Sequence, residues 1–155
     1  MPRARAITAA ALAALAIAAC GSRGSAEAEV TKSVRNWTAA LSEGDGEAAC
    51  DLMTAAGRAE LARFAAVFAK TAPAADCASN LRRFHAKLSP QVQRQTTDAD
   101  VAAVRVDGDV ATVRMEDGGP ARIRLRREGG EWHVDEAFRR GWRLVGAPSY
   151  AQGFR

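Results

Sequence analysis

The hydrophobic positions in the first part of the folded region repeat with the period of an α-helix. Over residues 29–42 they lie four, three and four residues apart, which places them on one stripe of a helix. The members of this stripe are Val30, Val34, Trp37 and Leu41. A turn with two glycines follows directly and ends the helix.

Three shorter helices are expected before residue 90. Each begins near a residue whose side-chain oxygen can accept hydrogen bonds from the free N–H groups of a first turn. These residues are Asp45, Thr54 and Asp76, with Ala75 as the alternative start of the last helix. The apolar positions are Ala49, Leu52 and Met53 on the first, Leu61, Phe64, Ala65 and Phe68 on the second, and Cys77, Leu81, Phe84 and Leu88 on the third, which Pro90 ends.

From about residue 100 the hydrophobic period changes from 3.6 to 2, which indicates strands. Two pairs of alternating segments flank glycine-containing turns and predict two hairpins. The four expected strands cover residues 101–106, 110–115, 121–126 and 131–138. In the last strand Trp132, Val134 and Glu136 alternate with His133 and Asp135. This alternation places His133 and Asp135 on the solvent face and makes Glu136 the one inward acid.

A sheet with one apolar face needs a cover, because the apolar face would otherwise lie in water. Helices precede all of the strands in this chain, and the connections between strands are short. The sequence therefore predicts an α+β fold, in which N-terminal helices pack on a curved antiparallel sheet of four or more strands.

The N-terminus has the layout of an export signal. Arg3 and Arg5 precede an apolar stretch over residues 6–19, and Cys20 follows. The stretch is shorter than the roughly 20 residues that a transmembrane helix needs, so a permanent membrane span is disfavoured. We expect residues 1–19 to be a signal peptide and residues 20–29, which are small and polar, to be a flexible tether.

The residues Ile17, Ala18, Ala19 and Cys20 resemble the lipobox of bacterial lipoproteins. The resemblance implies a diacylglycerol on the Cys20 thiol and acyl chains such as palmitate, which would anchor the chain on the extracytoplasmic side of the cell membrane. The alternative is ordinary secretion, because Ala16 and Ala18 also offer a cleavage site before Ala19. In that case Cys20 would remain a free thiol.

Two further cysteines, Cys50 and Cys77, remain once Cys20 is lipidated. In an oxidising compartment they can pair in only one way, and we predict that disulfide. A metal site at these thiols would need more ligands nearby, and the sequence offers none there. His85 and His133 also lack a His or Glu at the spacing of a zinc motif, so no metal or cofactor is expected.

The charge of the chain is modest. The full sequence carries +4, and without residues 1–19 it has 20 basic against 18 acidic residues, or +2. This value is too small to indicate nucleic-acid binding.

Several short segments of the chain recur in a known arrangement of helices and strands. They are Val34 to Leu41, Gly44-Asp45, Ala48-Ala49-Cys50, Leu52, Thr54, Gly57-Arg58 and Gly130 to Val134. Together with the predicted elements, they resemble the nuclear-transport-factor-two-like superfamily, and more narrowly actinobacterial lipoproteins with such a domain. The resemblance covers about residues 30–138. It implies a cone-shaped, cystatin-like roll over residues 30–147, followed by a tail over 148–155.

Enzymes of this superfamily need a carboxylate base and hydrogen-bond donors inside the cone. The single tyrosine, Tyr150, follows the last expected strand, and no position here matches the catalytic residues of the family. We therefore expect a non-catalytic binding or structural module that contacts an envelope protein or a small apolar ligand. A small isomerase or hydrolase is the alternative, in which His133 and Asp135 offer a general-base pair. An acid inside a deep cone would favour the enzyme, and a cone filled by its own side chains would favour the module.

Arginines recur on the polar face of the expected sheet. They can lie together and attract an anionic surface such as phospholipid headgroups, or they can form an ordinary solvated face. These residues are Arg105, Arg114, Arg122, Arg124 and Arg126. The segment 139–155 mixes arginines with Trp142, Tyr150 and Phe154. It suits either a partner-binding segment or a strand over 142–145 that closes the sheet edge.

Overall fold

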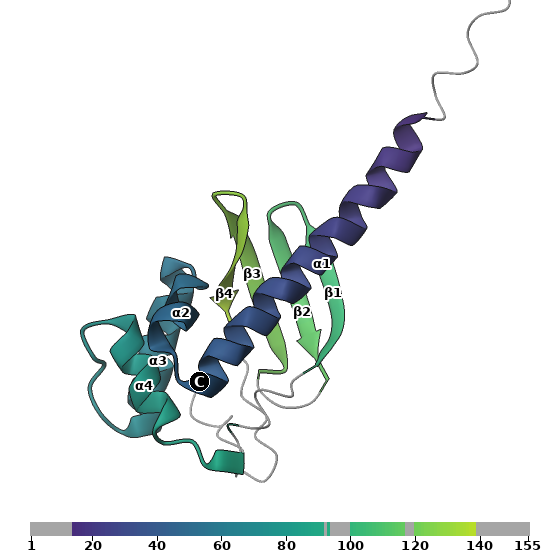
Figure 1. The fold of residues 1–155 in the computed structure, drawn as a ribbon. Helices are drawn as coiled ribbons and strands as arrows, with labels where there is room; N and C mark the ends of the chain where they lie inside the picture. The colour runs from purple at the N-terminus through teal and green to yellow at the C-terminus, as the bar shows by residue number, and fades with distance from the viewer. Residues whose placement is uncertain (1–13, 92, 94–99, 117–119, 139–155) are drawn as a thin grey trace, which may run out of the picture.

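A computed structural model describes residues 14–91, 93, 100–116 and 120–138, and it describes side chains from Gly24 onwards. Four helices precede four strands (Figure 1). The helices are α1 (Ala14–Glu43), α2 (Gly46–Asp51), α3 (Ala55–Ala69) and α4 (Cys77–His85), and the strands are β1 (Val101–Asp107), β2 (Val110–Met115), β3 (Arg122–Glu128) and β4 (Glu131–Glu136). The strands form one antiparallel sheet in the order β1-β2-β3-β4. The predicted α+β class is confirmed.

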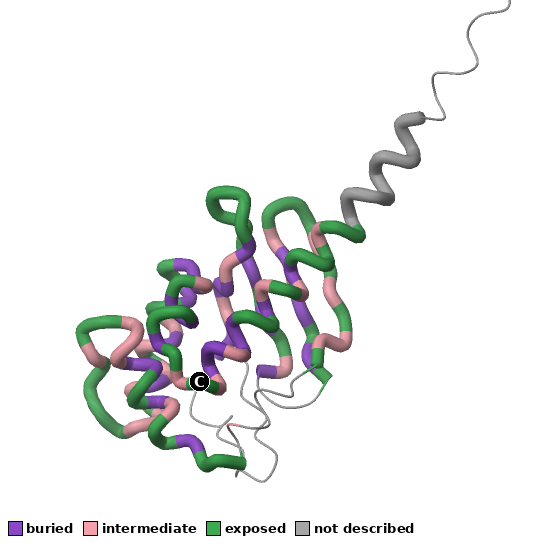
Figure 2. The backbone as a smooth tube through the Cα atoms, viewed as in Figure 1, coloured by how far each residue is buried: buried purple, intermediate pink, exposed green. Residues whose placement is uncertain are grey.

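Helix α1 crosses one face of the sheet, while α2, α3 and α4 gather beside the β4 edge (Figure 1). The predicted stripe of α1 is fully covered: Val30, Val34 and Trp37 are 0% exposed and Leu41 is 3% exposed. These side chains join the inner side chains of the sheet, among them Val113, in one buried cluster. Figure 2 shows the buried positions along α1 and the strands. The sheet therefore has an inner face toward α1 and an outer face away from it.

A second, smaller cluster lies between α3 and α4. Ala65, Phe84 and Leu88 are buried there, and Phe64 and Phe68 pack against them. Leu88 lies beyond the end of α4, which stops at His85 and not at Pro90 as expected. The helix ends earlier because the N–H groups of Lys87 and Leu88 bond to carbonyls three residues back, so the chain tightens into turns.

Helix α1 begins well before residue 29, so the expected start of this helix was wrong. Residues 20–29, which we expected to form a flexible tether, lie within α1. Once a helix is nucleated, each further residue adds one hydrogen bond at low cost, and the packed part of α1 supplies that nucleus. No helix in the described part of the chain combines the length and apolar character needed to cross a membrane.

The three predicted caps are confirmed. The side chains of Asp45 and Thr54 accept hydrogen bonds from the N–H groups of Ala48 and Gly57 at 3.0 and 3.1 Å. Asp76 accepts one from Ser79 N–H at 2.7 Å. This backbone bond, followed by a bond from the Ser79 side chain, holds the pKa of the Asp76 carboxyl below its ordinary value. Each cap fixes the point at which its helix begins.

The predicted disulfide is also confirmed. Cys50 and Cys77 are bonded, with their Cα atoms 6.1 Å apart. The bond ties the short helix α2 to the first residue of α4.

The start of α3 touches β4 closely enough to require glycine at position 57. A Cβ on Gly57 would lie 2.4 Å from the Val134 carbonyl oxygen. This approach is set by two backbone hydrogen bonds, Thr54 N–H to Val134 O at 2.9 Å and Val134 N–H to Leu52 O at 2.8 Å. Strand β4 therefore forms backbone hydrogen bonds with the segment between α2 and α3, as it would with a neighbouring strand.

We expect Gly57→Ala to destabilise the fold by about 1–3 kcal/mol, the usual cost of overpacking. Alanine is the better helix former by about 1 kcal/mol, so the close contact must reverse the sign of the effect. Urea unfolding measures the change. The control is Gly24→Ala, where no atom lies within 4 Å of the added methyl group and stability should rise or stay equal. A Gly57→Ala variant as stable as the parent would contradict the contact.

Candidate functional site

The pairing of β1, β2 and β3 places the five predicted arginines on the outer face of the sheet. Arg114 lies directly opposite Arg122. Thr112 lies opposite both Arg105 and Arg124, so these share one row. All five are exposed, and we call them the basic face: Arg105, Arg114, Arg122, Arg124 and Arg126.

Acidic residues of β4 neutralise one side of the basic face. Arg124 lies 2.6 Å from the Asp135 carboxylate and 3.7 Å from that of Glu136. Arg126 lies 3.9 Å from Asp135. Within the described residues, no carboxylate lies within 4.0 Å of the remaining three guanidinium groups, which are those of Arg105, Arg114 and Arg122. Uncompensated positive charge is thus concentrated on β1, β2 and the start of β3.

Asp135 is buried, so the prediction that it lies on the solvent face with His133 was wrong. Its exposed fraction is 6%. The register shifts between Arg124 and Leu125, which pair with Glu136 and Val134, so Asp135 has no opposite residue. Such a bulge re-aims the side chain of the extra residue.

The shift also overturns the expected direction of Glu136. Because Glu136 lies opposite Arg124, it belongs to the outer face and not to the interior. Asp135 instead accepts hydrogen bonds from the Thr54 hydroxyl at 2.9 Å and from Arg124 at 2.6 Å. It therefore joins the cap of α3 to the sheet, and these two hydrogen bonds do not involve the partly exposed His133. The proposed general-base pair is not assembled by these contacts.

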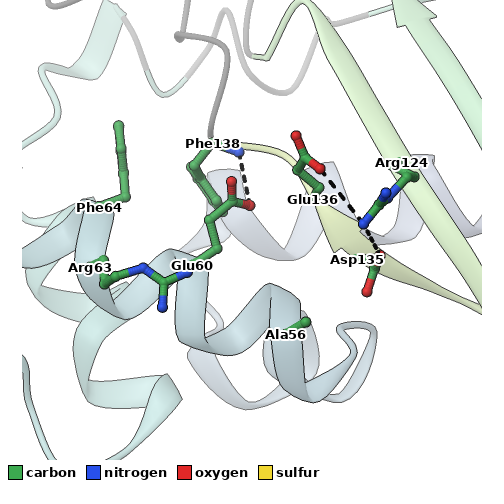
Figure 3. A pocket seen from close by; sticks show the side chains of 8 residues that line it. All are labelled: Ala56, Glu60, Arg63, Phe64, Arg124, Asp135, Glu136 and Phe138. Atoms are coloured by element: carbon green, nitrogen blue, oxygen red, sulfur yellow. Dashed lines mark hydrogen bonds and ion pairs between the residues drawn. The ribbon is translucent and has the colours of Figure 1, made fainter. Parts of the chain in front are cut away.

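An open pocket of about 470 Å³ lies where α3 meets the end of β4 (Figure 3). Phe64 and Phe138 supply its aromatic part and stack with ring centroids 4.9 Å apart. The remaining lining side chains are small or charged, and they come from α3, β3 and β4. They are Ala56, Glu60, Arg63, Arg124, Asp135 and Glu136.

The carboxylates of this pocket are bound to the protein itself. Oε2 of Glu60 accepts hydrogen bonds from the N–H groups of Ala137 and Phe138 at 2.9 and 3.2 Å. Figure 3 shows the bond from Phe138. Its other oxygen, Oε1, is buried with no hydrogen-bond partner among the described residues. Glu60 thus fixes the chain just after β4, and Asp135 fixes the start of α3. The pocket can accept a ligand with polar and aromatic parts, but its acids serve the fold.

This pocket was not predicted from the sequence. Glu60 lies 77 residues before Ala137, so no local pattern connects them. The available signal was the spacing of Ala56, Glu60 and Arg63, which places them on one side of α3.

The space between α1 and the inner face of the sheet is filled by side chains. Trp37 is 0% exposed and Phe138 is 1% exposed, and their rings meet edge to face at 6.0 Å. Met53, Ile123 and Leu125 are buried in the same cluster. Where the resemblance implies a cone, the described residues form a packed core.

The histidines do not assemble a metal site. Nε2 of His85 donates a hydrogen bond to the Ser42 carbonyl oxygen at 2.9 Å, and this bond joins α4 to α1. His133 lines a second, smaller pocket of about 310 Å³ between α1 and the β3–β4 hairpin, together with Lys32 and Trp132. Among the residues that the structure describes, no group of three or more His, Cys, Asp or Glu side chains is placed to hold a metal ion.

Several predicted features lie outside the described residues. These are the first part of the signal peptide, the side chain of Cys20, and the segment 139–155 with its expected strand. Comparison with known proteins adds no identification, because no family model, no curated protein and no solved structure matches the chain.

Proposed function

We propose that this chain is a membrane-tethered, non-catalytic binding or structural module of the bacterial cell envelope, built on a nuclear-transport-factor-two-like domain. A lipid on Cys20 holds it on the extracytoplasmic side. Its partner is an envelope protein or a small apolar ligand. The layout of residues 1–20 supports the export and the anchor.

The observation that carries the non-catalytic assignment is the packed space between α1 and the sheet. An isomerase or hydrolase of this fold holds its substrate in that space, next to an acid and hydrogen-bond donors. Here Trp37, Phe138 and their neighbours occupy it. Asp135 and Glu60 line the pocket where α3 meets β4, and they are bound to Thr54 and to the backbone after β4.

The disulfide supports the extracytoplasmic address. Disulfides persist in oxidising compartments and are rare in the bacterial cytoplasm. The bond between Cys50 and Cys77 is therefore what an exported domain would carry.

Intact mass spectrometry of the protein extracted from membranes tests the proposal. We expect a mature chain that begins at Cys20 and carries a diacylglyceryl group, with Cys50 and Cys77 protected from alkylation until a reductant is added. A Cys20→Ser variant should lose the added mass and leave the membrane fraction. An unlipidated start at Ala19, or a retained signal peptide, would contradict the anchor.

A further inference from the structure

Repulsion between like charges in the uncompensated part of the basic face destabilises the sheet, and the fold does not require these charges. Arg114 and Arg122 are directly opposite each other across β2 and β3. Like charges in this position destabilise an antiparallel pair, and no described carboxylate lies within 4.0 Å to relieve them. An external anion that spans both guanidinium groups would remove this repulsion.

The shape of the site selects an extended anion. Arg105 belongs to β1, Arg114 to β2 and Arg122 to β3, so the three charges spread over adjacent strands and not around a pocket. Guanidinium groups bind phosphate through paired hydrogen bonds. A flat array of phosphates matches three exposed arginines on a sheet better than a single small anion does.

The opposite charge gathers at the hairpin end of the sheet. The first half of α1 projects beyond the turn between β1 and β2 and the turn between β3 and β4 (Figure 1). Those turns carry the exposed carboxylates Asp107, Asp109, Glu128 and Glu131. They outnumber the exposed Arg127 at the same end, which itself lies 3.6 Å from the Glu29 carboxylate. An anionic leaflet would repel this end, although it is the end nearest Cys20, and would attract the basic face instead.

We propose that the basic face docks on the anionic phospholipid headgroups of the membrane that carries the anchor, so that the sheet lies flat on the leaflet. The location of that membrane rests on the proposed function. Cys20 precedes the first core residue, Val30, by ten helical residues, or about 15 Å. The anchor thus keeps the domain within reach of the headgroups. Lipid-headgroup contact itself needs only the arginines.

Vesicle binding of the full chain with Cys20→Ser tests the face without the anchor. The probes are vesicles of phosphatidylglycerol with phosphatidylcholine, and vesicles of phosphatidylcholine alone. One variant carries Arg105→Gln, Arg114→Gln and Arg122→Gln. Each basic residue near an anionic leaflet strengthens binding roughly fivefold, so this variant should lose roughly 100-fold in affinity for the anionic vesicles. High salt should remove most of the difference.

The matched control removes the same charge elsewhere, with Lys32→Gln, Arg35→Gln and Lys87→Gln at exposed helical or turn positions. It should keep its affinity within about threefold, because these charges do not face the leaflet. Both chains retain the same N-terminal segment, so any contribution from that segment cancels. Circular dichroism should show that the face variant is folded, since it also loses the repulsion between Arg114 and Arg122.

Equal losses in the two variants would overturn the inference, because the attraction would then depend on net charge alone. Unchanged anionic-vesicle binding of the face variant would also overturn it. If the face variant instead lost binding only to an acidic polypeptide such as polyglutamate, the face would belong to a protein partner. A missing lipid on Cys20 together with a face-specific loss on vesicles would refute the proposed anchor and support the face.

Discussion

Replacing Trp37 by alanine should destabilise the domain by about 3–5 kcal/mol, the largest effect that we expect from one substitution. Trp37 is 0% exposed and contacts Phe138 edge to face. It lies in the cluster that joins α1 to the sheet, so its removal leaves a cavity between the two layers. The lost transfer free energy and the cavity both contribute.

Trp37→Phe is the matched control, because Nε1 of Trp37 is buried without a hydrogen-bond partner among the described residues. Phenylalanine keeps an aromatic ring and removes a donor whose unsatisfied burial costs about 1–3 kcal/mol. This gain offsets the smaller volume, and we expect the stability to stay within about 1.5 kcal/mol of the parent. Urea unfolding of the three chains measures both changes.

The same series tests whether the interior is filled. The parent should not bind an apolar dye such as anilinonaphthalene sulfonate with a defined stoichiometry, whereas the cavity in the folded Trp37→Ala variant can admit a small apolar molecule. A parent that binds the dye saturably, together with a loss below about 1 kcal/mol for Trp37→Ala, would mean an open cone. That result would favour the isomerase or hydrolase over the module.

Most of the fold could be predicted from the sequence because local patterns determine it. The stripe Val30, Val34, Trp37 and Leu41 is covered as its spacing requires, and each of the three caps binds the N–H group three residues ahead. In the third strand, Ile123 and Leu125 are buried between exposed arginines. The alternation of apolar and basic residues was therefore enough to predict that these arginines share the outer face of the sheet.

The features that differ from the prediction arise from contacts between segments that are distant in the sequence. The bulge at Asp135 depends on how β4 pairs with β3 and on the Thr54 hydroxyl, 81 residues away in the chain. A one-residue shift of register moves a side chain to the other face, so Asp135 and Glu136 both departed from simple alternation. The pocket at Glu60 was also set by packing partners that no local window contains, whereas the early start of α1 extends a helix whose buried part begins at Val30.

Removing the disulfide with Cys50→Ala and Cys77→Ala should lower the free energy of unfolding by about 3.5 kcal/mol. The two cysteines are 27 residues apart, and a loop of that length restricts the unfolded chain strongly. The effect should be large here because α2 has six residues, too few for an isolated helix. Replacing both cysteines avoids a free thiol that could pair with Cys20.

Urea unfolding of the parent with and without reductant, beside the double variant, measures this contribution. The reduced parent and the double variant should agree, and the oxidised parent should exceed both. Helix α2 also packs tightly on α4, because a Cβ on Gly46 would lie 2.6 Å from the Ala78 carbonyl oxygen. If this packing alone held α2 in place, the loss would fall below about 1 kcal/mol, and the disulfide would add little beyond the contact. A loss near the full value would instead show that the bond stabilises the domain chiefly by restricting the unfolded chain.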